Sequence, residues 1–101
     1  MAPRIDLQAK LEELLGNTNV YFQPPTNVQI VYPCIIYSRD AADSKFADDK
    51  LYSYTHRYQV THISRDPDSS VPDKVAALPL CVFNRFFTKD NLNHDVFFLY
   101  Y

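Results

Sequence analysis

The sequence predicts a single α+β domain, in which a small antiparallel or mixed β-sheet packs with two flanking helices in the order α-β-β-β-α-β-β. Three observations lead to this prediction. The length of 101 residues is that of one domain. Hydrophobic residues make up 47% of the chain and charged residues 22%, which is the balance of an ordinary globular protein. Segments with a hydrophobic period of two also alternate with two stretches whose apolar residues have helical spacing.

The first helix is predicted over Arg4–Leu15. Its leucines follow the i, i+4, i+7, i+8 spacing that gives one apolar stripe: Leu7, Leu11, Leu14 and Leu15. Gly16 is the only glycine of the chain and directly follows this stripe. Glycine is favoured just beyond a helix because it tolerates a positive φ angle, so this position marks the end of the helix.

Two strands are predicted in the first half of the chain. Val20–Gln23 is a short strand that ends at two prolines, because proline has no N–H to donate to a β-ladder. Residues Val28–Tyr32 are expected to be extended. Cys34–Arg39 is nearly continuously apolar, which is typical of a central strand covered on both faces.

The segment Asp40–Lys50 interrupts this pattern. Its sequence, DAADSKFADDK, contains four aspartates, two lysines and a single aromatic residue, Phe46. We expect an exposed loop or the arm of a long hairpin. Loops of this length inside compact domains are usually functional or disordered.

The second half begins with the longest predicted strand, Leu51–Ser64. Its period of two places five side chains on one face: Tyr54, His56, Tyr58, Val60 and His62. Ser70 and Asp73 then have the spacing of a capping box, which predicts a short second helix closed by Pro79.

Two further strands are predicted at the end of the chain, Cys81–Thr88 and Val96–Tyr101. The polar sequence KDNLNHD between them is predicted to be a hairpin loop.

The residues do not favour catalysis or metal binding. His56 and His62 share a strand face but lie about 20 Å apart at roughly 3.3 Å per residue, so they cannot bind one ion. Asp66 and Asp68 resemble the start of a calcium loop, but the required glycine and final glutamate are missing, and turn geometry explains them. No nucleophile-elbow, P-loop or dinucleotide-binding motif is present. We expect no enzyme activity, cofactor or metal.

The net charge and the cysteines indicate which kinds of partner and which cell compartment fit this chain. The formal net charge is −2, and no cluster of lysine and arginine exists that would attract nucleic acid. Cys34 and Cys81 lack CxxC spacing and are expected to be reduced, buried, small apolar residues of an intracellular protein. No apolar run approaches the roughly 20 residues of a membrane span, and no signal peptide is expected.

With these elements placed, the chain resembles tailed-bacteriophage neck proteins of the tail terminator or tail-completion type. The resemblance rests on the opening helix followed by VYFQPP, on YPCIIY, and on RYQVTHISRDPDSSVPDKVAALP with the closing FNRFFTKDNLNHDVFFLYY. These segments cover nearly the whole chain. The element order also fits the family, whose members share a small sheet with flanking helices.

The resemblance implies a structural role at the tail–head junction of a virion, after synthesis in the host cytoplasm. Such proteins form a ring, commonly a hexamer, on the last tail-tube ring. They stop tube polymerisation and dock the head connector or stopper protein, and the genomic DNA passes through the bore without specific binding. No membrane is involved. Interface residues predicted for a neighbour or the tube are Phe46, Asp48 and Asp49, with Asp66 and Asp68 for a second contact.

Other functions fit the same residues. A head-closure or connector protein on the portal side would also be a small ring former. A small non-phage binding module could use its sheet edge to add a strand from a partner. An enzyme acting through His56 or His62 is a further alternative that nothing else in the sequence predicts.

Overall fold

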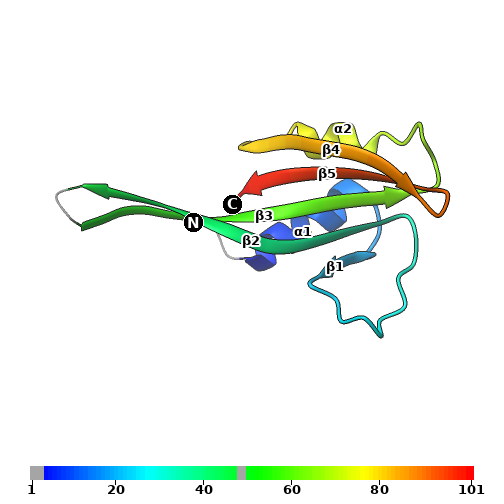
Figure 1. The fold of residues 1–101 in the computed structure, drawn as a ribbon, viewed down its shortest axis with the longest axis horizontal. Coiled ribbons are helices and arrows are strands. Elements are labelled where there is room, and N and C mark those ends of the chain that lie inside the picture. The colour runs from blue at the N-terminus through cyan, green and yellow to red at the C-terminus, as the bar shows by residue number, and fades with distance from the viewer. Residues whose placement is uncertain (1–3, 48–49) are drawn as a thin grey trace.

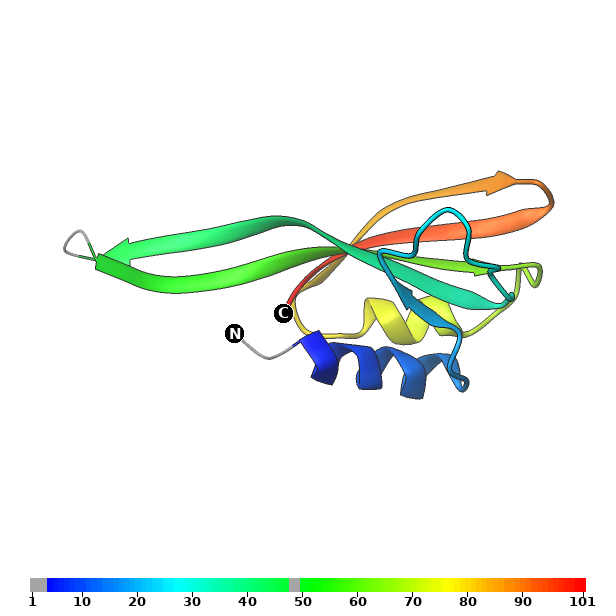
Figure 2. The ribbon, with the colours of Figure 1, turned by 90° about the horizontal axis from the view of Figure 1, so that it is seen from below.

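A computed structural model describes the backbone of residues 4–47 and 50–101, with side chains for residues 4–40 and 56–101. Five strands form one mixed sheet in the order β1-β2-β3-β5-β4, and two helices lie against the same face of it (Figures 1 and 2). The predicted α+β class and element order are therefore confirmed. The elements are α1 (Arg4–Leu15), β1 (Val20–Phe22), β2 (Cys34–Ala47), β3 (Lys50–Ser64), α2 (Val71–Ala76), β4 (Cys81–Lys89) and β5 (Leu92–Tyr100).

Helix α1 has the predicted boundaries. Leu7, Leu11 and Leu15 are buried, and Leu14 packs against them in a partly buried position. Gly16 has a φ angle of 84°, and its N–H donates to the carbonyl of Glu12 at 2.9 Å. The single glycine thus ends the helix for the reason the sequence suggests, since few other residues adopt this conformation without strain.

The main core lies between the helices and the sheet. It combines the α1 leucines with Val75 of α2 and with sheet residues that include Ile35, Tyr37, Val60, Phe97 and Leu99. A smaller cluster of Cys34, Ile63 and Leu92 has Tyr21, Ile30 and Ile36 packed against it. Neighbouring side chains of a strand point to opposite faces. Because Cys34 and Ile35 are both fully buried, the start of β2 is covered on both faces, as predicted.

The segment predicted as a loop or arm is an arm. Strands β2 and β3 pair with each other from Cys34–Ile63 out to Ala47–Lys50. β3 pairs with β5 only between Arg57 and Ser64, so the outer part of the hairpin is a two-stranded ribbon. We call residues 41–47 and 50–56 the arm. It projects along the longest dimension of the molecule, whose extents are 51 × 27 × 23 Å (Figures 1 and 2).

The start of α2 differs from the prediction. Ser70 is the N-cap residue, but its side chain makes no capping hydrogen bond. Instead, the Ser69 hydroxyl accepts the N–H of Val71 at 3.3 Å, so the preceding serine takes over part of this role. The predicted capping box is therefore wrong, although a short helix begins where it was expected.

The final hairpin is also tighter than predicted. Only Asp90 and Asn91 form the turn, with φ angles of 55° and 62°, and β5 already begins at Leu92. Positive φ at both central residues is the geometry of the two-residue turn that matches strand twist, and aspartate and asparagine tolerate it. The polar run NHD was assigned to the loop, but its residues belong to the strand. Among the described residues, neither helix has the length and hydrophobicity of a membrane span.

Candidate functional site

Those predicted contact residues that the structure describes lie in two regions at opposite ends of the sheet. The backbone of Phe46 belongs to the arm, where it pairs with Leu51. Asp48 and Asp49 lie outside the described residues, as does the side chain of Phe46. Asp66 and Asp68 lie in the turn between β3 and α2, at the end of the sheet away from the arm (Figure 1). The two predicted groups are therefore not brought together within one chain.

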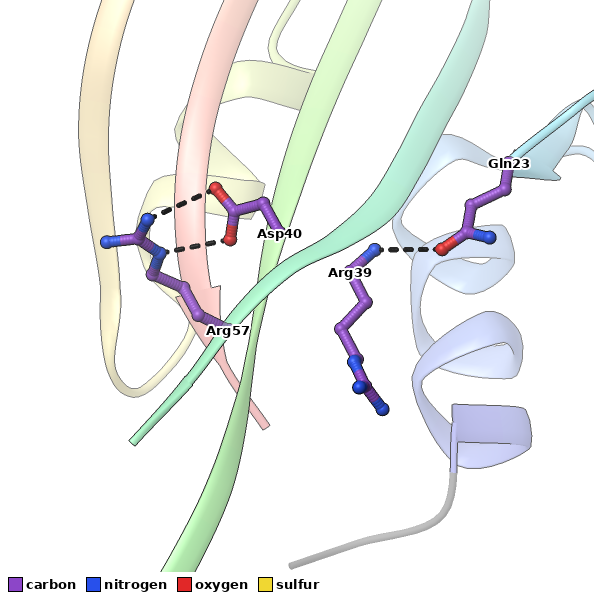
Figure 3. Close-up of polar contacts among 4 residues, drawn as sticks. All are labelled: Gln23, Arg39, Asp40 and Arg57. Atoms are coloured by element: carbon purple, nitrogen blue, oxygen red, sulfur yellow. Dashed lines mark hydrogen bonds and ion pairs between the residues drawn. The ribbon is translucent and has the colours of Figure 1, made fainter. Parts of the chain in front are cut away.

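An ion pair fixes the root of the arm. The guanidinium of Arg57 donates from Nε to Asp40 Oδ1 at 3.0 Å and from a terminal nitrogen to Oδ2 at 3.3 Å (Figure 3). The same guanidinium lies 4.5 Å from the ring centre of Phe98. The hydrogen bond that Arg57 donates to Asp40 raises the pKa of Arg57. This two-point geometry orients both groups more strictly than a single contact would.

The other side of the root is tied to the rest of the sheet. The N–H of Arg39 donates to Gln23 Oε1 at 3.2 Å (Figure 3), and its guanidinium lies 3.1 Å from His56 Nε2. The N–H of Tyr101 donates to the carbonyl of His56 at 3.0 Å. A register shift falls between Arg39 and Ala41, where the arm leaves the sheet. Bulges bend strands, so this shift helps to set the direction of the arm.

At the opposite end lies an acidic pocket of about 390 Å³. Four aspartates line it, and its described lining residues include no lysine or arginine. Asp66 and Asp68 come from the turn, where Asp66 Oδ1 accepts the N–H of Asp68 at 2.9 Å. Asp73 belongs to α2 and Asp95 to β5. We use the name acidic pocket for these four aspartates together with His62 and Phe86.

His62 is a deeply buried member of the acidic pocket. Its side chain is 1% exposed, and neither ring nitrogen has a hydrogen-bond partner within the described part of the chain. Burial lowers the pKa of His62 to about 4, so the imidazole is neutral at pH 7. Asp95 pairs with His62 across the strands. Its pKa is raised, first by burial and then by the charge of Asp73, with His94 acting in the opposite direction.

Sequence reasoning missed His62 as a distinct site residue. The strand pattern places His56 and His62 on one face without distinguishing them, since only the tertiary packing buries the second. The charges of Asp40 and Arg57 were visible in the sequence. The ion pair between Asp40 and Arg57 could not be predicted without the hairpin register, because that register decides which side chains meet across the strands.

Strand β4 presents a third surface. It is an edge strand of the described sheet, and three large apolar side chains on it are exposed: Val82, Phe83 and Phe86. Phe83 keeps one contact with the core, an edge-on packing against Phe97 at 5.6 Å between ring centres. Exposed apolar groups gathered on an edge strand are typical of a surface that meets a partner.

The buried thiol of Cys34 and the arrangement of possible metal ligands can be judged for the described side chains. Burial raises the pKa of Cys34 to about 12, so its thiol stays protonated at neutral pH and is a poor nucleophile. Among the residues whose side chains are described, no group of three histidine, cysteine, aspartate or glutamate residues is placed to hold a metal ion.

Comparison of the sequence with known protein families found no match, and comparison with curated proteins found no significant similarity.

Proposed function

We propose that this chain is a structural neck protein of a tailed phage, which forms a ring on the end of the tail tube. The ring stops tube polymerisation and provides the surface on which the head docks. The observation that carries the proposal is the arm. Its two strands pair only with each other beyond Arg57. A two-stranded ribbon adds little stability by itself, so its length favours contact with another molecule.

A closed ring needs a contact in which one surface of a subunit meets a different surface of the next. The arm and the β3–α2 turn, whose residues line the acidic pocket, lie at opposite ends of the sheet (Figure 1), and β4 carries exposed apolar side chains. An arm laid on the neighbouring subunit would supply such a contact. The proposal gives the tail tube protein one face of the ring and the head connector or stopper the other. Because these faces differ, the ring cannot template another tube ring.

The charge of the chain is compatible with a bore that passes DNA. The formal net charge is −2, and no run of lysine and arginine is present in the sequence. Attraction of DNA requires clustered cations. We therefore propose that genomic DNA passes through the ring, which is most simply a hexamer, without being bound specifically.

A specific observation favours a second candidate, a binding module that adds a strand from a partner to its sheet. The outer edge of β4 is unpaired in the described sheet, and Val82 on this strand is 60% exposed. Strand addition uses such an edge. A head-closure protein on the portal side remains the alternative within the neck proposal, since it would form a ring with the same parts.

The first experiment is electron microscopy of particles made when the gene is deleted from its phage. Filled heads beside unattached, overlong tail tubes are expected for a terminator. Normal tails beside leaking or empty heads would move the protein to head closure. Ordinary infectious particles would overturn the neck proposal and favour the binding module.

A second experiment removes the arm. Ala42 and His56 are partners across the hairpin, so residues 43–55 can be replaced by Asn-Gly, which forms a two-residue hairpin turn. We expect circular dichroism to show that the shortened protein keeps its fold. In sedimentation velocity with added tail tubes, we expect the native chain to form rings and the shortened protein to remain monomeric. Rings of the shortened protein would contradict the role of the arm.

Phe46→Ala tests the same contact with a single substitution. We expect the variant to fold as the native chain does and to assemble more weakly. Ile5→Ala serves as a matched control, because Ile5 is 70% exposed on α1 and lies outside the arm. An unfolded Phe46→Ala protein would show instead that Phe46 is part of the core.

A further inference from the structure

We propose that the acidic pocket receives an arginine side chain from a protein partner. The inference goes beyond the proposed function, because it depends on the chemistry of the pocket and not on ring formation. It rests on three features of the pocket: its uncompensated charge, the unpartnered imidazole of His62, and the exposed ring of Phe86.

The described residues that line the acidic pocket include four aspartates and no lysine or arginine. Its four carboxylates come from three places in the fold, the β3–α2 turn, α2 and β5. The negative charge of Asp73 repels that of Asp95 and contributes to the raised pKa of Asp95. Arg65, which precedes Asp66 in the chain, lines an adjoining pocket that shares Asp66. A cation placed among these carboxylates would be attracted by all of them at short range.

His62 provides an independent sign of a missing ligand. A buried polar group without a hydrogen bond costs free energy, and native proteins rarely leave one in that state. The imidazole lines the acidic pocket, is 1% exposed, and finds no hydrogen-bond partner for either nitrogen among the described residues. A neutral imidazole has one nitrogen that accepts a hydrogen bond. A ligand rich in N–H donors would satisfy this nitrogen and the carboxylates together.

The guanidinium of arginine fits better than a metal ion. No described group of three ligating side chains is placed to hold a metal, and a volume of about 390 Å³ is far larger than a bare ion needs. A guanidinium carries five N–H donors in a planar fork, and arginine stacks on aromatic rings. Phe86 lines the pocket and is 53% exposed, so its ring is available for that contact.

The surroundings favour an arginine that belongs to a protein. Strand β4 carries exposed Phe83 in addition to Phe86, and these two residues pair with Phe97 and Asp95 of β5, so they share the sheet face of the pocket. A free small molecule in the pocket would leave these apolar side chains in water. A protein partner could cover them while inserting one arginine, which combines an apolar surface with a charged anchor as many interfaces do.

The test uses the isolated full-length protein and the peptide acetyl-Gly-Arg-Gly-amide. NMR follows the imidazole resonances of His62 during the titration, and the same peptide with citrulline in place of arginine is the neutral control. We expect a saturable shift with the arginine peptide only. Asp73→Asn and Asp95→Asn should each weaken binding by about tenfold, which corresponds to about 1.4 kcal/mol. Asp6→Asn, on α1 and outside the pocket, should leave it unchanged.

Several results would overturn the inference. One is the absence of a saturable shift, and another is an equal response to the citrulline peptide. Saturation of the His62 shift by Mg²⁺ or Ca²⁺ without a response to the peptide would identify a metal site. Tighter binding of free L-arginine than of the peptide would indicate a small-molecule site. Asp73 is exposed on α2, so Asp73→Asn keeps the test decisive if Asp95→Asn does not fold. Unweakened binding to Asp73→Asn would also contradict the proposal.

Discussion

At the scale of single residues, burial decides the chemistry of His62. Its ordinary pKa of 6.5 is lowered to about 4, because the imidazolium would lose its hydration in the acidic pocket. The aspartates around it do not reverse this effect. A histidine that looks like an acid–base group in the sequence is therefore held neutral in the folded protein.

This shift predicts a loss of stability in mild acid. The unfolded chain takes up a proton at His62 near pH 6.5, whereas the folded chain does so only near pH 4. The contribution of His62 is thus complete above pH 6.5 and is lost as the pH falls toward 4. The total is about 3 kcal/mol, from 1.36 kcal/mol per pKa unit. Urea unfolding between pH 7.5 and pH 4 measures it.

His62→Leu is the control for this prediction, because leucine cannot titrate. The raised pKa of Asp95 works in the opposite direction, since the folded state then binds a proton more readily than the unfolded chain and gains stability as the pH falls. The comparison of native protein and variant isolates the histidine. Equal pH dependence in both would contradict the assignment.

The two cysteines should differ in reactivity. Cys34 is fully buried with its pKa raised to about 12, while Cys81 is partly exposed and its pKa is raised by burial. The thiolate is the reactive form. With a thiol reagent at pH 8 we expect Cys81 to react slowly and Cys34 only after unfolding in urea. Mass spectrometry of the labelled peptides distinguishes them, and rapid native labelling of Cys34 would count against its burial.

At the scale of elements, α1 is held to the sheet by its buried stripe and by a polar contact. The Tyr37 hydroxyl donates to Gln8 Oε1 at 2.5 Å and accepts from Arg4 at 3.0 Å. This pairing satisfies a buried tyrosine and fixes the helix over β2. The leucine stripe, however, supplies most of the buried apolar surface between helix and sheet.

Two substitutions on α1 test whether the buried leucine stripe holds the helix to the sheet. Leu11→Ala removes a fully buried side chain and should lower the free energy of unfolding by about 2–5 kcal/mol. Ile5→Ala changes an exposed apolar side chain on the same helix and should cost at most about 0.5 kcal/mol. Chemical denaturation measures both. Similar values for the two variants would mean that α1 does not dock through the leucine stripe.

Elements were predicted to different degrees for a physical reason. The boundaries of α1 follow from local features, namely the leucine spacing and Gly16, and they were found correctly. The extension of β2 beyond Arg39 does not follow from local features, because DAADSKFADDK has no alternating hydrophobic pattern. Its strand is defined by pairing with residues 50–56, and a partner strand is invisible to a local pattern. The start of β5 at Leu92 was missed for the same reason. The polar residues that follow Leu92 belong to the strand because they pair with β3 and β4.

At the scale of the whole molecule, the arm makes the protein elongated. The Cα radius of gyration is 14.7 Å. A compact domain of this length would have about 13 Å. In small-angle X-ray scattering, we expect the variant with residues 43–55 replaced by Asn-Gly to fall measurably toward the compact value. An unchanged radius would mean that the arm folds back onto the body in solution.

The α+β class, the order of the elements and the main core face follow from the amino-acid sequence alone, since they depend on local spacing and alternation. It also named Asp66 and Asp68, while the neck function and the contact role of Phe46, Asp48 and Asp49 stay predictions. Long-range packing brought Asp73, Asp95 and His62 beside those aspartates, and strand pairing placed residues 41–47 and Lys50 in a hairpin. Such juxtapositions join residues far apart in the chain, and long-range packing, rather than local pattern, fixes them.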